Sequence, residues 1–112
     1  MSAVLQQLFS VLEERKSNPP PNSYTARLYQ GGVSKIGKKI EEEAREVIEA
    51  ASEPGEPGRR HLIYESSDLL YHLLVMLAYN GVRLDEVEAE IARRFGQSGM
   101  EEKAARTALA AK

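Results

Sequence analysis

Cysteine is missing from all 112 residues of this chain. Disulfides, thiolate zinc sites and cysteine nucleophiles are therefore excluded, and any metal must be held by carboxylates, histidine or backbone oxygen. A surplus of basic residues is missing too, because 15 Lys and Arg stand against 17 Asp and Glu and leave a formal charge of −2. That balance argues against a general nucleic-acid-binding protein, which normally presents a strongly basic face.

Long hydrophobic runs are also missing. The most apolar stretch, from Leu69 to Tyr79, is too short to span a bilayer and directly follows Asp68. The first nine residues have no basic region, no continuous apolar run and no small-residue cleavage site, so they do not resemble a secretory signal. We therefore expect a cytoplasmic protein that binds neither membrane nor nucleic acid.

The length accommodates one domain, with the core thin enough that oligomerisation would help. Hydrophobic residues make up 42% of the chain and charged residues 29%, as is ordinary for a globular protein. We expect the domain to occupy residues 1–95. Residues 96–112 form an Ala-rich, charged tail whose weak apolar pattern leaves its order open.

Apolar residues recur at helical spacing through the domain, and no alternating strand pattern interrupts them. Three consecutive prolines end the first predicted helix, and Gly31-Gly32 ends the second. The segment from Glu53 to Gly58, EPGEPG, is expected to be an exposed loop. The predicted helices are Ala3–Lys16, a short Ser23–Gln30, Val33–Ala51, Arg60–Asn80 and Leu84–Phe95. The pattern indicates an all-α helical bundle of about four main helices.

The helix predicted over residues 60–80 is apolar in nearly every direction between Leu69 and Leu77, with only Tyr71 and His72 interrupting. A helix that is apolar all round is buried on several sides. Three other modest helices are too few to cover it, which predicts that the bundle is completed by homodimerisation.

Two acidic motifs occur on the two longest predicted helices: Glu42-Glu43-Ala-Arg-Glu46 and Glu65-Ser-Ser-Asp68. Residues three or four apart share a helical face, and Glu43 falls at the edge of its apolar stripe, so it should be partly buried. If the two helices pack antiparallel, the motifs meet at mid-length. Like charges at this spacing repel, and Mg²⁺ bound by carboxylates and substrate phosphates would offset that repulsion. The alternative is a solvated glutamate face.

Basic residues add a second clue. Lys35 and Lys39 are four residues apart and could share a phosphate, although Lys39 could equally pair with Glu43. Arg59 and Arg60 precede the second acidic motif and could also reach phosphate, although exposed loop arginines often do nothing specific.

Histidine and tyrosine side chains are weaker candidates. His72 could be a general base or a substrate contact, but within an apolar run a hydrogen-bonded core histidine is the more common outcome. Tyr24, Tyr71 and Tyr79 could stack on a base, whereas core packing is the more common role of each alone.

Three segments together closely resemble the phosphoribosyl-ATP pyrophosphohydrolase family of histidine biosynthesis, which belongs to the all-α NTP pyrophosphatase (MazG-like) superfamily. They are Ser23-Tyr-Thr25, Lys35–Glu46 and Glu65–Val75, and the resemblance covers roughly residues 5–95. The Glu-Glu-x-x-Glu and Glu-x-x-Asp motifs are shared by enzymes acting on many nucleotides. The Ser-Tyr-Thr segment and the Asp-Leu-Leu-Tyr-His-Leu-Leu run narrow the match to this family.

The resemblance implies Mg²⁺-dependent hydrolysis of 1-(5-phosphoribosyl)-ATP to 1-(5-phosphoribosyl)-AMP and pyrophosphate, the second step of histidine biosynthesis. The implied Mg²⁺ ligands are Glu42, Glu43, Glu46, Glu65 and Asp68. Glu41 makes a triple glutamate, but spacing from Lys39 aligns Glu42 and Glu43 with the motif and places Glu41 on another face.

Roles follow for the remaining candidates. Bound metal would lower the pKa of a water and orient it, and Glu42 or Glu46 could take its proton. Charge developing on the leaving group would be neutralised by basic side chains, for which the candidates are Lys35, Lys39, Arg59 and Arg60. Ser23, Tyr24 and Thr25 are expected to contact the phosphoribosyl end.

Two rival functions are open. A MazG-like house-cleaning pyrophosphatase would act on an ordinary or damaged nucleoside triphosphate instead. A non-enzymatic helical dimerisation module would show neither Mg²⁺-dependent stability nor pyrophosphate release.

Overall fold

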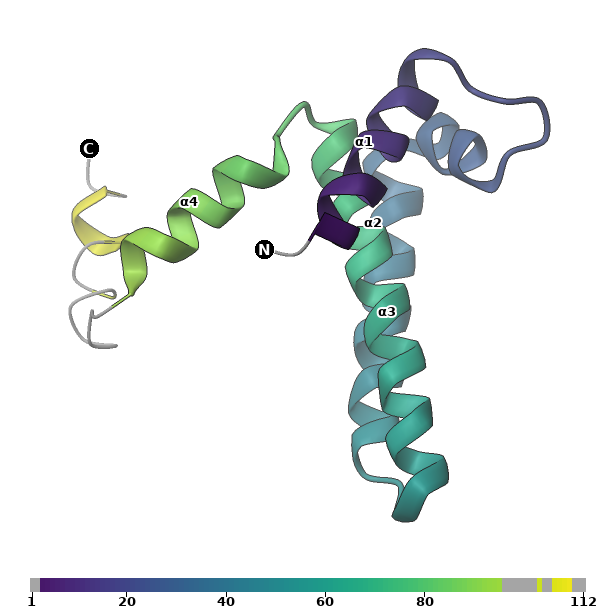
Figure 1. Cartoon of the computed structure of the whole chain (residues 1–112), viewed down its shortest axis with the longest axis vertical. Coiled ribbons are helices and arrows are strands. Elements are labelled where there is room, and N and C mark those ends of the chain that lie inside the picture. Colours follow the sequence, from purple (N-terminus) through teal and green to yellow (C-terminus); the bar gives the residue numbers. More distant parts are fainter. Residues whose placement is uncertain (1–2, 96–102, 104–105, 110–112) are drawn as a thin grey trace.

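The computed structural model of the chain describes residues 3–95, 103 and 106–109. Four helices make up the described part: α1 (Ala3–Ser17), α2 (Tyr24–Ala51), α3 (Gly55–Tyr79) and α4 (Leu84–Arg94) (Figure 1). Residues 103 and 106–109 are also helical, while the other residues of the tail, whose order the sequence left open, lie outside the described residues. Across these ranges there is no strand, and no helix has the length and hydropathy to cross a membrane. The predicted all-α class is confirmed.

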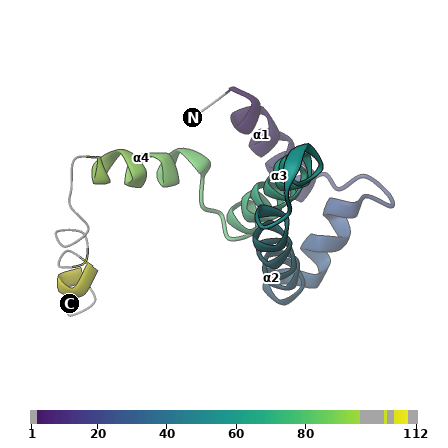
Figure 2. The same ribbon diagram turned by 90° about the horizontal axis from the view of Figure 1, so that it is seen from below.

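An antiparallel hairpin of α2 and α3 forms the centre of the fold: α3 runs along the front of α2 in Figure 1, and the two helices lie next to each other in Figure 2. The first helix packs against the end of this hairpin that lies far from the α2–α3 turn. All three helices contribute to one buried cluster, which includes Leu12 of α1, Leu28 and Ile36 of α2, and Leu74 and Val75 of α3. The core therefore holds α2 against α3, which is the packing under which the two acidic motifs were expected to meet.

The predicted break between two helices at Gly31-Gly32 appears as a sharp kink within α2. Gly32 adopts φ 67° and ψ −160°, a conformation that essentially only glycine tolerates. A Cβ at this position would also lie 3.1 Å from the Tyr79 hydroxyl. The kink turns the first part of α2, beginning at Tyr24, relative to the rest of the helix.

The prediction that the whole segment from Glu53 to Gly58 is a loop is wrong. Helix α3 begins at Gly55, five residues before the predicted start at Arg60. Its first turn accommodates Pro57 because the first N–H groups of a helix have no partner within the helix. Gly58 is buried, and a Cβ there would lie only 2.2 Å from the carbonyl oxygen of Glu53. The turn is therefore tight.

The fourth helix projects away from the hairpin in both views (Figures 1 and 2). Leu84 at its start is buried, whereas Ile91 and Phe95 are 42% and 78% exposed. The side chain of Gln6 in α1 donates a hydrogen bond to Glu88. The apolar side chains of Ile91 and Phe95 are thus largely uncovered by the described residues.

Candidate metal centre

Three carboxylates from two helices converge at mid-length of the hairpin. Glu43 and Glu46 of α2 and Glu65 of α3 each offer one oxygen, and the three oxygens lie within 4.8 Å of one another. Glu43 and Glu46 share a face because they are three residues apart, and the antiparallel packing brings Glu65 opposite them. The two motifs meet as expected, and the predicted burial of Glu43 is confirmed at 7% exposure.

Two of these carboxylates are buried with incomplete hydrogen bonding. Glu43 Oε2 and Glu65 Oε2 have no hydrogen-bond partner among the described residues, and Glu65 is only 6% exposed. Burial raises the pKa of Glu43, and the negative charge of Asp68 acts in the same direction. Hydrogen bonding to Glu65 raises the pKa of Glu46. Buried, unpartnered carboxylate oxygens in an all-oxygen donor set fit a hard divalent cation such as Mg²⁺.

The other two predicted ligands border this trio. Asp68 is half-buried on α3 and close enough to influence the charge on Glu43. Glu42 is paired with the Lys39 ammonium, with 3.5 Å between Nζ and Oε2. The structure thus brings three of the five predicted ligands into one cluster and places the other two beside it.

His72 is the buried polar link between the start of α2 and the acidic cluster. Its Nδ1 lies 2.9 Å from the Asp68 backbone carbonyl oxygen, and its Nε2 lies 2.8 Å from the Tyr24 hydroxyl. These partners suit a neutral imidazole that donates from Nδ1 and accepts from the phenol. Nδ1 is also 3.9 Å from Glu43 Oε1. His72 is therefore a hydrogen-bonded interior histidine at the edge of the site.

The predicted lysines differ in their environment. Lys39 is half-buried, and the neighbouring Tyr24 and Glu42 raise its pKa. The predicted alternative of a Lys39–Glu43 pair is replaced by pairing with Glu42, one position nearer. Lys35 is exposed one turn earlier on α2. Lys39 is thus the lysine placed beside the carboxylates.

The two predicted arginines lie in the first turns of α3, near the α2–α3 turn. Both are exposed, and Arg60 Nε lies 3.8 Å from Glu56 Oε1 in the same helix. No hydrogen bond joins either side chain to the three clustered carboxylates among the described interactions. The structure therefore does not bring them into the cluster.

The three residues predicted to contact the phosphoribosyl end also lie in different environments. The Ser23 hydroxyl accepts a hydrogen bond from the Ala26 amide and caps α2. Thr25 is 1% exposed, and its hydroxyl lies 2.6 Å from that of Tyr71. Tyr24 is 46% exposed and hydrogen-bonded to His72. Of the three, Tyr24 presents a surface beside the carboxylates.

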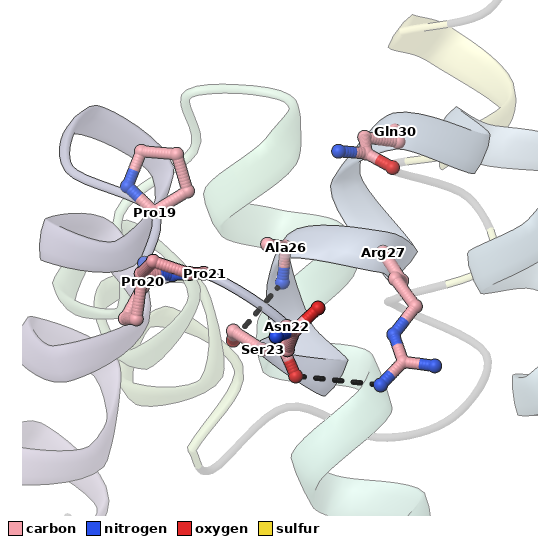
Figure 3. Close-up of a pocket in the computed structure, with 8 residues that line it drawn as sticks. All are labelled: Pro19, Pro20, Pro21, Asn22, Ser23, Ala26, Arg27 and Gln30. Atoms are coloured by element: carbon pink, nitrogen blue, oxygen red, sulfur yellow. Dashed lines mark hydrogen bonds between the residues drawn. The ribbon is translucent and has the colours of Figure 1, made fainter.

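A separate depression lies at the start of α2, where Ser23 lines it together with the three prolines (Figure 3). Arg27 also lines it, and its guanidinium donates a hydrogen bond to the Asn22 carbonyl oxygen at 3.3 Å. None of the acidic candidates lines this depression.

His61 was not singled out by the sequence. Its Nδ1 lies 3.0 Å from both carboxylate oxygens of Glu53, and its Nε2 lies 3.4 Å from Glu65 Oε1. Hydrogen bonding to Glu53 raises the pKa of His61. The available signal was its spacing, since His61 precedes Glu65 by four residues and so shares its helical face.

Comparison with known proteins gives a consistent result. A family model described as phosphoribosyl-ATP pyrophosphohydrolase matches residues 5–95. A phosphoribosyl-ATP pyrophosphatase of Rhodopirellula baltica is 54% identical over 93% of this chain and 87% of its own length. Proteins of the same name from Methylococcus capsulatus and Rhodobacter capsulatus are 50% and 49% identical, over 92% and 91% of this chain and 95% and 96% of theirs.

Proposed function

This chain belongs to the phosphoribosyl-ATP pyrophosphohydrolase family, and from that membership we propose that it hydrolyses 1-(5-phosphoribosyl)-ATP to 1-(5-phosphoribosyl)-AMP and pyrophosphate in a Mg²⁺-dependent reaction. The family consists of hydrolases of phosphoanhydride bonds, so the class of reaction follows from membership. The substrate of this chain and its need for Mg²⁺ are what we propose. Because the substrate is an ATP derivative, we propose the cytoplasm as its location.

One observation carries the proposal: Glu43, Glu46 and Glu65 share a site in which two buried oxygens have no partner among the described residues. Mg²⁺ bound there, with Asp68 and Glu42 beside it, would screen the triphosphate and lower the pKa of an attacking water. Magnesium sites of phosphate-transferring enzymes are commonly built from a few carboxylates and substrate phosphates.

The surrounding side chains have separate roles in the proposed reaction. Glu46 is exposed, whereas Glu42 is paired with Lys39, so we propose Glu46 rather than Glu42 as the group that accepts a proton from water. Lys39 would neutralise charge on the departing pyrophosphate. Tyr24, whose hydroxyl is hydrogen-bonded to His72, would offer an exposed aromatic face near Glu43 and Asp68.

Homodimerisation is part of the proposal. Three apolar side chains that share one face of α3 are 43% to 54% exposed: Ile63, Leu70 and Leu73. A second copy packing on this face would cover them and complete a core that is thin for one chain. Sedimentation should give twice the mass of one chain, and a monomer at micromolar concentration would contradict this part.

The direct test is a pyrophosphate-release assay with phosphoribosyl-ATP and Mg²⁺, comparing the wild type with Glu43→Gln and Asp68→Asn. We expect Glu43→Gln to lower kcat/KM by about 100-fold, because its carboxylate is central to the cluster. The matched control is Glu41→Gln, which makes the same change of charge on an exposed neighbour. Release that survives EDTA, or equal loss in the control, would overturn the proposal.

The rival functions are tested in the same assay. Side-by-side turnover of phosphoribosyl-ATP and the common nucleoside triphosphates separates this substrate from that of a MazG-like house-cleaning enzyme. A dimerisation module without activity would release no pyrophosphate from any of them.

A further inference from the structure

We propose that His61 is a positioning residue for the acidic cluster, holding Glu65 in place through a Glu53–His61–Glu65 bridge across the α2–α3 turn. The proposal rests on the proposed function, because it assigns His61 a task in binding the divalent cation at Glu65. His61 itself is proposed neither as a ligand of the cation nor as a substrate contact.

The bridge is anchored at Glu53, immediately after α2. Both Glu53 carboxylate oxygens lie 3.0 Å from His61 Nδ1. The backbone amide of Glu53 donates to the Ala50 carbonyl oxygen at 3.1 Å, and the Glu53 carbonyl oxygen leaves no room for a Cβ on Gly58. The main chain at Glu53 is thus packed against both helices, and its 45% exposed carboxylate is oriented by its contacts to the imidazole.

At its other end the bridge reaches one oxygen of Glu65 and leaves the second unengaged. His61 Nε2 lies 3.4 Å from Glu65 Oε1, whereas Glu65 Oε2 is buried and has no hydrogen-bond partner among the described residues. A carboxylate held at one oxygen presents the other in a fixed direction. Groups that orient metal-binding side chains in this way typically contribute 10- to 100-fold to metal affinity or activity.

Without this contact, repulsion from Glu43 and Glu46 would favour rotation of the Glu65 side chain away from the cluster. Binding of the cation would then have to return the Glu65 carboxylate to the cluster, and the free energy required for this would weaken binding. Because His61 is 40% exposed at its side chain and the Nε2–Oε1 distance is long, we expect the lower end of the range, about tenfold.

His61 could affect cation binding as a nearby positive charge or as a positioning contact, and these two roles predict opposite changes in cation affinity when His61 is removed. An imidazolium near the cluster repels a divalent cation, so its loss would tighten binding if charge were its main effect. Loss of a positioning contact weakens binding instead. The sign of the change therefore distinguishes the two roles.

The test is a titration with Mn²⁺ followed by electron paramagnetic resonance, without substrate, on the full chain. We expect His61→Leu to raise the Kd for Mn²⁺ about tenfold and Glu53→Gln to raise it by a smaller factor. His61→Gln should recover part of the affinity, since its amide N–H can still donate to Glu65. Glu56→Gln is the matched control for Glu53→Gln, because it removes an exposed carboxylate from the same turn, and it should bind as the wild type does.

Activity supplies the second readout. In His61→Leu the Mg²⁺ concentration for half-maximal rate should rise by the same factor, while kcat at saturating Mg²⁺ stays near that of the wild type. Unchanged or tighter Mn²⁺ binding by His61→Leu, with a wild type that binds Mn²⁺ and cleaves its substrate, would overturn the positioning role alone. A wild type that binds no Mn²⁺ would overturn the proposed function and the positioning role with it. Should His61→Leu fail to fold, His61→Gln and Glu53→Gln carry the same comparison.

Discussion

Replacing Glu43 by glutamine should make the metal-free protein more stable and at the same time remove its response to Mg²⁺. The side chain is 7% exposed, and one of its oxygens has no hydrogen-bond partner among the described residues. One of its carboxylate oxygens lies within 4.8 Å of an oxygen of Glu46 and an oxygen of Glu65. Glutamine keeps the shape of the side chain and removes its charge.

The magnitude follows from the separation of the charges. Two full charges 4.8 Å apart repel by about 3.5 kcal/mol at an effective dielectric constant of about 20. Uptake of protons by the cluster limits this cost, so we expect the metal-free variant to gain about 1 to 2 kcal/mol in the free energy of unfolding. For a domain of this size each kcal/mol corresponds to roughly 4 °C in Tm.

Thermal melts in EDTA and in Mg²⁺, at one fixed protein concentration, measure both effects. The wild type should be stabilised by about 2.7 kcal/mol when Mg²⁺ reaches 100 times its Kd. The Glu43→Gln variant should start from a higher Tm in EDTA and gain little from Mg²⁺. The order of the two Tm values should therefore reverse between the two conditions.

A Glu43→Gln variant that melts below the wild type in EDTA would refute this reasoning. It would mean that the carboxylate contributes native hydrogen bonds rather than unrelieved repulsion. An undiminished response to Mg²⁺ in the variant would show that the cation binds elsewhere.

Three further predictions follow from the same structure. Because burial raises the pKa of Glu43, the folded metal-free protein binds more protons than the unfolded chain, so its Tm in EDTA should fall as pH rises above 4.5, the ordinary pKa of the side chain, and less so in Glu43→Gln. Gly32→Ala should lower the free energy of unfolding by about 1–3 kcal/mol in urea denaturation, because its φ of 67° is strained for alanine and the new Cβ would crowd the Tyr79 hydroxyl. Lys16→Met should cost about 1 kcal/mol in the same assay, since Lys16 Nζ lies 3.0 Å from the carbonyl oxygens of both Ala78 and Tyr79 at the end of α3.

The regular parts of the fold were predictable because hydrophobic periodicity determines which helical face is buried. Helix α1 was predicted to within one residue, and the kink at Gly32 falls where paired glycines indicated a break. The start of α3 was not predicted, because prolines and glycines are typical of loops but are also tolerated in a first helical turn. Their role depends on the close approach of Gly58 to the backbone of Glu53, which the residue types alone do not specify.

The candidate site was predictable to the extent that it depends on spacing within one helix. Glu43 and Glu46 share a face by their separation, and Glu65 joins them because the hairpin is antiparallel. Which carboxylate pairs with Lys39 depends on side-chain conformation, and Glu42 rather than Glu43 does so. The burial of Thr25 and the bridge through His61 depend on contacts between elements, which spacing within a helix does not specify.

The location of a bound divalent cation tests the central claim most directly. Crystals grown with Mn²⁺ should give an anomalous peak within about 2.2 Å of carboxylate oxygens of Glu43, Glu46 and Glu65. The same experiment on Glu43→Gln should give a much weaker peak there. A peak only at other residues, or none in the wild type at millimolar Mn²⁺, would contradict the assignment of these carboxylates to the cation.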